Sequence, residues 1–219
     1  RWPAALLLAS LPWLPAAELP FSHEFHLKSV GAKCVDCHSA AATSQAASDS
    51  NLPTEAHCMK CHDLPGATPI DRAALADLRS AALKSEKRTY RFDHQFHLKL
   101  GNLAPLIAAA VDGGGYLGPA DDIRRHLDTQ DSCQACHRGL AETARASQDH
   151  LPRMADCLVC HSEIDNPFSC EKCHLPGAEL RPASHSRNFV DLHSTGKLSL
   201  DKESCLTCHG RNFACMGCH

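Results

Sequence analysis

The chain has 219 residues and a formal net charge of −3, with 22 Lys and Arg against 25 Asp and Glu. This near-neutral balance, without a basic patch or an aromatic platform, argues against a nucleic-acid-binding protein. Aromatic residues make up only 5 % of the chain, which is little for a core of the size that this length normally closes. Another group must therefore supply buried apolar area.

Residues 1–17 begin with Arg1, continue through a short apolar stretch and end on small residues. This is the layout of a secretory signal peptide with its start truncated. The apolar part is shorter than the roughly 18 residues that span a bilayer, and Pro12 and Pro15 interrupt it. We predict a cleaved signal peptide or an N-terminal anchor here, with an ordered tail as a third alternative. The protein is expected to be exported, periplasmic or extracellular, with membrane association through this segment as an option.

The pentapeptide Cys-X-X-Cys-His occurs seven times and uses all 14 cysteines. Two thiols three positions apart can bond to the two vinyl groups of one haem, and the adjacent His can then reach its iron. Zinc ribbons and disulfides also use paired cysteines, but neither requires a His at the next position. We therefore predict seven covalently bound haem c groups, each with its iron.

The predicted attachment and proximal ligand residues follow directly from the motif. The attachment cysteines are Cys34, Cys37, Cys58, Cys61, Cys133, Cys136, Cys157, Cys160, Cys170, Cys173, Cys205, Cys208, Cys215 and Cys218. The proximal ligands are His38, His62, His137, His161, His174, His209 and His219.

Seven haems leave too little polypeptide to enclose each one separately. We expect a mostly irregular and α-helical fold with few short helices and little β structure, wrapped around a chain of closely packed haems. The predicted units are a dihaem module at 18–66, a helical connector at 67–91, a trihaem module at 92–178 and a dihaem module at 179–219. Within the connector, Thr68 and Pro69 predict the start of a helix over 68–88.

The second module opens with an internal repeat of the first. Residues 21–28 and 92–99 both read Phe-X-His-X-Phe-His-Leu-Lys, which indicates a duplicated haem module. The segment 101–120 that follows is apolar at 106–111 and has three consecutive glycines at 113–115. It is too short to span a membrane and is interpreted as a loop over a haem or at an interface.

The histidine count decides the expected coordination. The chain has 16 His, and nine remain after the seven proximal ligands, so every iron could receive a second imidazole. A six-coordinate iron with two His has no open position for substrate and transfers electrons. The nine are His23, His26, His57, His94, His97, His126, His150, His185 and His193.

At Phe-X-His-X-X-His the sequence resembles the class III multihaem cytochromes c of the trihaem and tetrahaem kind. The resemblance implies His94, His97 and His150 as distal ligands of the third, fourth and fifth haems. It likewise implies His23 and His26 for the first and second. The third module departs from the family pattern, so His185 and His193 are assigned to the last two haems without an order. His57 and His126 are interpreted as residues that lie beside a ligand or at the surface and do not bind iron.

Three functions remain open from the sequence. The leading one is an electron-transfer protein that carries or stores electrons between a membrane or periplasmic donor and a terminal acceptor. The second is a multihaem reductase with one open iron acting on a small oxyanion or a metal. The third is a haem-bearing subunit of a larger redox complex or a cytochrome polymer. No catalytic residues are predicted. The expected partners are redox proteins, such as a quinone-oxidising membrane complex or other multihaem cytochromes.

Overall fold

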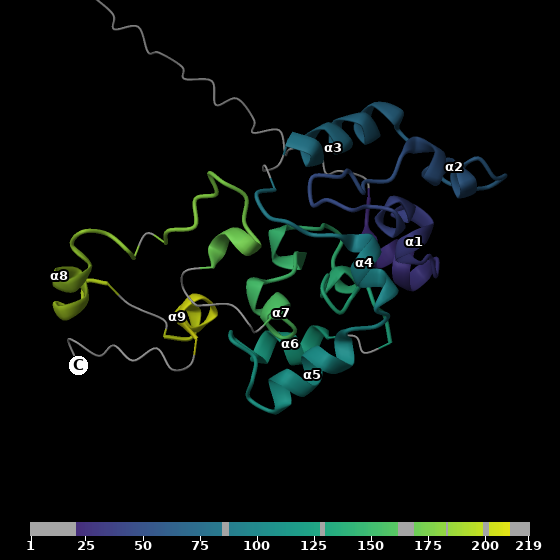
Figure 1. The fold of residues 1–219 in the computed structure, drawn as a ribbon. Coiled ribbons are helices and arrows are strands. Elements are labelled where there is room, and N and C mark those ends of the chain that lie inside the picture. Colours follow the sequence, from purple (N-terminus) through teal and green to yellow (C-terminus); the bar gives the residue numbers. More distant parts are fainter. Residues whose placement is uncertain are drawn as a thin grey trace, which may run out of the picture.

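The computed structural model describes residues 21–84, 88–127, 130–161, 169–182, 184–198 and 202–210. The N-terminal segment 1–17 and the seventh motif, Cys215 to His219, therefore lie outside the described residues. In the described part, short helices alternate with long irregular connections, and the one β pairing is an isolated bridge between Tyr90 and His174. This confirms the expected fold class of few short helices and little β structure (Figure 1).

The described helices are short, and two of them, α2 and α9, include a complete Cys-X-X-Cys-His motif. Their bounds are α1 Cys34–Cys37, α2 Glu55–His62, α3 Arg72–Lys84, α4 His94–Lys99, α5 Ala104–Asp112, α6 Asp121–His126, α7 Met154–Leu158, α8 Phe189–Ser194 and α9 Lys202–His209. Single turns of π- or 3-10 helix lie at Phe25–Ser29, Ser39–Ala42, Leu140–Glu142, Gln148–His150 and Cys170–Lys172. Within these ranges no helix has both the length and the apolar character needed to cross a membrane.

The connector helix is shorter than predicted. It runs from Arg72 to Lys84 instead of 68–88, because the side chain of Asp71 accepts hydrogen bonds from the amides of Ala73 and Ala74 at 2.9 and 3.1 Å. An aspartate in this position satisfies the free amides of a first helical turn. Thr68 instead contributes its carbonyl to His62. The predicted cap at Thr68 was wrong for that reason.

The segment 101–120 is not the loop that the sequence indicated. It contains α5, which has Pro105 in its first turn, and the side chain of Asn102 accepts from the amide of Ala104 at 3.0 Å. Proline is well tolerated there because the amide it lacks has no partner inside the helix. The apolar run of this segment thus forms a helix with Ile107 and Val111 four residues apart on its buried side.

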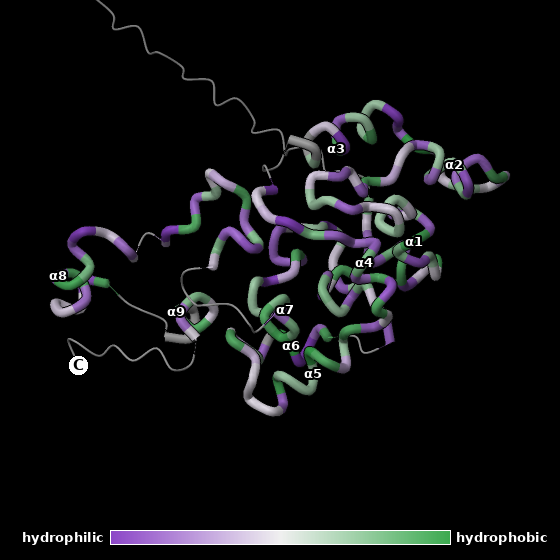
Figure 2. Tube along the Cα trace, viewed as in Figure 1, coloured by the Kyte–Doolittle hydropathy of each residue, from purple (hydrophilic) through white to green (hydrophobic). Residues whose placement is uncertain are grey.

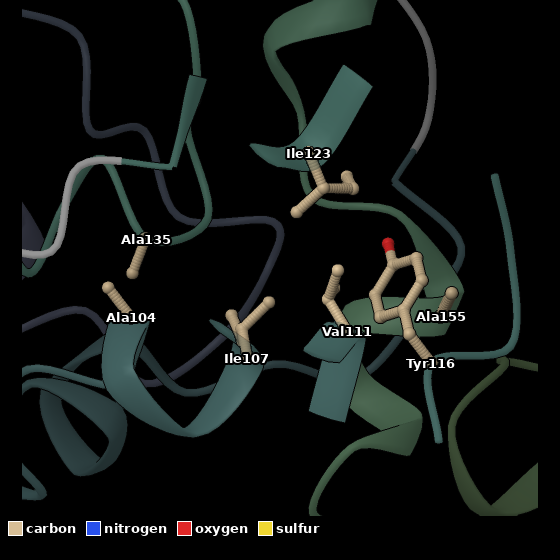
Figure 3. Packing of buried hydrophobic residues seen from close by; sticks show 7 residues of the cluster. All are labelled: Ala104, Ile107, Val111, Tyr116, Ile123, Ala135 and Ala155. Atoms are coloured by element: carbon tan, nitrogen blue, oxygen red, sulfur yellow. The ribbon is translucent and has the colours of Figure 1, made fainter. Parts of the chain in front are cut away.

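This inserted segment contributes most of the main hydrophobic cluster found among the described residues (Figure 3). The cluster contains Ala104, Ile107, Val111, Tyr116, Ile123, Ala135 and Ala155. Elsewhere, hydrophobic and hydrophilic residues are interspersed along the trace (Figure 2). The small size of the cluster agrees with the low aromatic content.

Two copies of one structural unit pack against each other. The first repeat is residues 21–62, and the second repeat is residues 92–99 together with 130–161. Both place the first cysteines of their two motifs 24 residues apart, Cys34 to Cys58 and Cys133 to Cys157. The insertion of residues 100–127, which includes α5 and α6, interrupts only the second repeat. The two repeats therefore have the same motif spacing, but only the second repeat has the insertion.

The contacts between the repeats are reciprocal. The amide of Glu24 donates to the carbonyl of Thr143 at 2.9 Å, and the amide of Gln95 donates to the carbonyl of Ser44, also at 2.9 Å. Glu24 and Gln95 hold the same place in the duplicated octapeptide, and Ser44 and Thr143 both lie six residues after a proximal His. Each repeat thus accepts a backbone hydrogen bond from the duplicated octapeptide of the other, as in a two-fold symmetric dimer.

Candidate haem-binding sites

Five pairs of imidazole rings face each other in the described residues. The distances between ring centres and the interplanar angles are 6.5 Å and 11° for His23–His38, 6.2 Å and 44° for His26–His62, 6.5 Å and 8° for His94–His137, 6.3 Å and 54° for His97–His161, and 5.9 Å and 1° for His185–His209. Each pair joins a motif histidine to one outside the motifs.

This spacing suits an iron ion between the rings. Two imidazoles bound on opposite sides of one metal, with bonds of about 2 Å and about 1 Å from each nitrogen to its ring centre, have centres about 6 Å apart. The first four pairs are those that the family resemblance implies. The fifth brings His185, rather than His193, to the sixth motif. The residues present therefore fit a haem iron with two axial imidazoles at each of these places.

Hydrogen bonds orient the imidazoles for metal binding. In the motif histidines, Nδ1 of His38, His62 and His137 lies 2.7, 2.6 and 3.0 Å from the carbonyl oxygens of Asn51, Thr68 and His150. A carbonyl can only accept, so Nδ1 must carry the proton and donate it. The lone pair is then left on Nε2, the nitrogen available to a metal.

The histidines of the duplicated octapeptide follow the same rule. Nδ1 of His26 donates to the carbonyl of Ser22 at 2.8 Å, and Nδ1 of His97 donates to the carbonyl of Asp93 at 2.7 Å. Each ring thus bonds to the carbonyl four positions earlier, the same carbonyl that accepts from the backbone amide of that histidine. The local helix therefore fixes the direction in which each ring presents Nε2.

Burial keeps several of these rings neutral. It lowers the pKa of His23 to about 4, with further lowering from the nearby His38, His150 and His26. Burial likewise lowers the pKa of His94 and of His137, each with added repulsion from a neighbouring imidazole. A lowered pKa means that the ring stays uncharged at pH 7. The neutral ring is the form with a lone pair for a metal.

A phenylalanine aligns each pair of octapeptide histidines. The Phe21 ring stacks on His26 with centres 4.6 Å apart and meets His23 edge-on at 4.9 Å. The Phe92 ring contacts His97 and His94 in the same way, at 4.4 and 4.7 Å. In the third module, Phe189 lies between His185 and His193, at 6.5 and 5.5 Å. The phenylalanine of the repeat is thus a spacer between two ligand positions.

The variable residue after that phenylalanine is a cap, which the sequence reading did not identify. The side chain of Asp93 accepts from the amide of Phe96 at 2.7 Å, and Oγ of Ser22 accepts from the amide of Phe25 at 3.1 Å. Ser and Asp are favoured at this position because they satisfy a free amide of the first turn. The signal was present in the sequence as Ser or Asp one residue before a His.

His57 has a capping role rather than a position facing another imidazole. Its Nδ1 accepts from the amide of Thr54 at 3.1 Å, at the start of α2, and its Nε2 lies 2.9 Å from Oγ of Ser39. Both ring nitrogens are therefore engaged. In the second repeat the equivalent residue is Asp156, which accepts from the amide of Arg153 at 2.7 Å. The equivalence explains why a His and an Asp occupy the same place.

Asp156 belongs to a buried polar group that the sequence reading also missed. It accepts from the hydroxyl of Tyr116 at 2.8 Å and from the guanidinium of Arg138 at 2.7 Å. The side chains of Asp156 and Arg138 are only 3 % and 8 % exposed. Arg138 directly follows the motif histidine His137, so this ion pair connects the third haem site to the start of α7.

The structure does not bring His150 and His174 together. Nδ1 of His150 accepts from the amide of Ser147 at 3.0 Å, and the described residues show no ring contact between it and His174. His126 lies with Nδ1 3.0 Å from Oε2 of Glu142. His126 and His150 both line a cavity of about 410 Å³, together with Arg138 and Arg153. The assignment of His150 to the fifth haem stays a prediction.

Attachment cysteines of different motifs lie close together. Sγ of Cys34, Sγ of Cys133 and a carboxylate oxygen of Asp131 all lie within 4.8 Å of one another. Cys34 belongs to the first motif and Cys133 to the third, so the two repeats meet at their attachment sites. Before a haem is attached, the hydrogen bond with Cys133, burial and the Asp131 charge raise the pKa of the Cys34 thiol.

Comparison with known proteins found one family model and one relative that are similar to parts of this chain. Residues 19–82 match the family model described as cytochrome c7 and related cytochrome c. A protein of Nitratidesulfovibrio vulgaris, "Menaquinone reductase, multiheme cytochrome c subunit", is 22 % identical over 157 residues, which are 70 % of this chain and 65 % of that relative. The chain thus spans about two thirds of the relative's length. No solved structure matches the chain significantly.

The two matches agree with each other and with the sequence resemblance. The family match covers the whole first repeat, with His23, His26 and both of its motifs, and the relative is named as a multihaem cytochrome c. Covalently bound haem c and electron transfer are the common properties of such proteins. Residues 19–82 are thus similar to the cytochrome c7 family, and the larger part of the chain is similar to a multihaem cytochrome c.

Proposed function

We propose that the chain is a seven-haem cytochrome that carries electrons through irons closed on both sides by histidine. The observation that carries this proposal is the set of five imidazole pairs, whose ring centres lie 5.9 to 6.5 Å apart. When bound, each haem supplies an iron that gains and loses one electron. An iron with two imidazoles offers no free position to a substrate, so the arrangement supports transfer and not catalysis.

The protein residues have separate tasks in this proposal. The cysteines of each motif hold a porphyrin covalently, and the paired histidines fix the coordination. Backbone carbonyls hold Nδ1–H of His38, His62 and His137, which prevents rotation of the rings and raises their basicity toward the metal. Rings that are held in place need little rearrangement when the iron changes its charge.

We further propose that the chain works as an exported subunit of a quinone-linked redox complex. The supporting observation is the relative that is named as the multihaem subunit of a menaquinone reductase. In this proposal the partners are a protein that takes electrons from a quinone in the membrane and an acceptor outside the cytoplasm. Export through the segment 1–17 fits this location, because haem is generally attached to such motifs outside the cytoplasm.

A second function is favoured by one specific observation at the fifth motif. His150 and His174 do not face each other in the described residues, whereas five other pairs do. An iron at His174 with no second imidazole would be open to a small oxyanion, and the protein would then be a reductase.

Two measurements separate these functions. The mass of the purified holoprotein counts the covalent haems, with seven expected. Low-temperature electron paramagnetic resonance of the ferric protein and its ferrous optical spectrum with carbon monoxide then report open irons. Wholly low-spin signals and no response to carbon monoxide support the electron carrier. A high-spin signal of one haem equivalent, with a matching carbon monoxide shift, supports the reductase.

A further inference from the structure

The contact between Cys34 and Cys133 joins haem sites that are not neighbours in sequence. The first and third motifs are separated by the second motif, the connector and the insertion. Even so, the sulfur atoms of these two cysteines and the carboxylate of Asp131 lie within 4.8 Å of one another. No other pair of attachment cysteines in the described residues forms such a cluster with a carboxylate.

The reciprocal contacts of the two repeats explain this meeting. Glu24 bonds to Thr143 and Gln95 bonds to Ser44, which places the first motif of one repeat opposite the first motif of the other. Symmetry alone then brings Cys34 to Cys133, because both hold the first position of their motifs.

Attachment cysteines of successive motifs also lie near one another. Cys37 has Cys58 and Cys61 among its neighbours, which connects the first site to the second. Cys136 has Cys157 among its neighbours, which connects the third site to the fourth. Cys157 in turn has Cys173, which connects the fourth site to the fifth.

Cys34 and Cys133 form the centre at which the two repeats meet, and Asp131 makes this centre asymmetric. It lies two residues before Cys133, and the corresponding residue of the first repeat, two before Cys34, is Ala32. Oδ1 of Asp131 accepts from the amide of Cys133 at 2.7 Å, and Oδ2 lies 3.8 Å from Sγ of Cys34. One carboxylate therefore reaches the attachment sites of both repeats.

We propose that electrons cross between the two repeats at the first and third haem sites, and that Asp131 lowers the reduction potentials of these two haems together. The crossing moves one electron from the reduced site to the oxidised site, and no bond is made or broken. A fixed negative charge stabilises the ferric state, which carries one more positive charge than the ferrous state. This inference rests on the proposed electron-carrier function and names the path within it.

The test is a spectroelectrochemical titration of the holoprotein and its Asp131→Asn variant. Asparagine keeps the acceptor for the amide of Cys133 and removes only the charge. We expect the ferrous-to-ferric ratio of two haem equivalents to rise about tenfold at a fixed applied potential, which is 59 mV for a one-electron couple. The other haems should keep their potentials. A shift of no haem, of one haem or of all haems would overturn the proposal.

A matched pair of variants sharpens the test. Ala32→Asp with Asp131→Asn transfers the charge from the second repeat to the first, and the symmetry of the centre predicts potentials close to those of the wild type. Asp71→Asn is the control, since Asp71 also caps a helix but has no hydrogen bond with an attachment cysteine in the described part of the chain, and it should shift no haem. Potentials in the double variant that stay at those of Asp131→Asn would contradict the assigned centre.

Haem content and spin state keep the two proposals distinguishable. Both are measured for every variant by mass and by paramagnetic resonance. A full set of low-spin haems with unshifted potentials in Asp131→Asn rejects the path and leaves the electron carrier standing. An open iron in the wild type rejects the electron carrier itself.

Discussion

The two repeats have the same arrangement of haem-binding residues, but they differ in the hydrophobic residues that pack around it. In the second repeat the insertion contributes Ile107, Val111 and Ile123 to a hydrophobic cluster. The cluster also contains Ala135, which adjoins a motif cysteine, and Ala155, which lies two residues before one. The first repeat has no counterpart of the insertion, and its buried hydrophobic residue in the described part is Ala47. The second repeat therefore has a protein core of its own, whereas the first repeat depends on its haems.

The equivalent capping residues show the same difference. Asp156 in the second repeat is buried and paired with Arg138, whereas His57 in the first repeat is bonded to Ser39 at an exposed site. Both residues cap the helix that begins just before the second motif of their repeat. The same capping position is therefore expected to contribute differently to stability in the two repeats, because its surroundings differ.

The largest expected effect comes from removing one equivalent haem from each repeat. Cys58→Ala with Cys61→Ala should leave residues 55–62 without a core, so that their amide hydrogens exchange with solvent at least about 100-fold faster. Cys157→Ala with Cys160→Ala should leave α5 protected, because its cluster is made of protein side chains. Hydrogen exchange followed by mass spectrometry measures both. Equal loss of protection in the two variants would show that the repeats share one support.

The next effect concerns the buried ion pair. Asp156→Ala should lower the free energy of unfolding of the holoprotein by about 3–5 kcal/mol, because the Arg138 charge is left buried without a partner. His57→Ala, at the equivalent position, should cost about 1 kcal/mol, the usual cost of a lost cap. Guanidinium unfolding of both variants gives the comparison.

The ion-pair prediction has an internal control. Replacing both partners, Asp156→Leu with Arg138→Met, should recover a large part of the loss, since no charge then stays unpaired. A double variant as unstable as Asp156→Ala would mean that the hydrogen bond from Tyr116 matters more than the ion pair.

A smaller effect is expected within α5. Ile107→Ala removes a side chain that is 3 % exposed and should cost about 2–5 kcal/mol. Leu106→Ala, on the same helix but 53 % exposed, should change stability by about 0.5 kcal/mol or less. Thermal or guanidinium unfolding, with haem content as a check, distinguishes them. Similar losses in both would contradict the position of α5 in the cluster.

The smallest expected difference between the repeats is at the irons. His23→Ala and His94→Ala should each convert one haem equivalent to a form that binds carbon monoxide, because the two residues hold the same place in equivalent sites. His57→Ala should convert none. Ferrous optical spectra with carbon monoxide measure the number of open irons. A carbon monoxide response in His57→Ala would show that this residue is a ligand after all.

The sequence by itself determined the local chemistry of this protein. The Cys-X-X-Cys-His motifs, the surplus of histidines and the duplicated octapeptide predicted haem attachment, the fold class and the family, because each depends on residues close together in the chain. The four octapeptide histidines also lie where the resemblance implies, because one helical turn sets the spacing of His23 from His26 and of His94 from His97.

Only the tertiary structure decided how these local units are arranged. Helix α5 could not be distinguished from an apolar loop, because its stability comes from packing against Ala135 and Ala155. The choice of His185 for the sixth motif, the capping role of His57 and the buried Asp156 depend on partners distant in sequence. The meeting of Cys34, Cys133 and Asp131 depends on the way the two repeats hold each other. Contacts of this kind join residues from 18 to 97 positions apart, and no spacing within a motif can encode them.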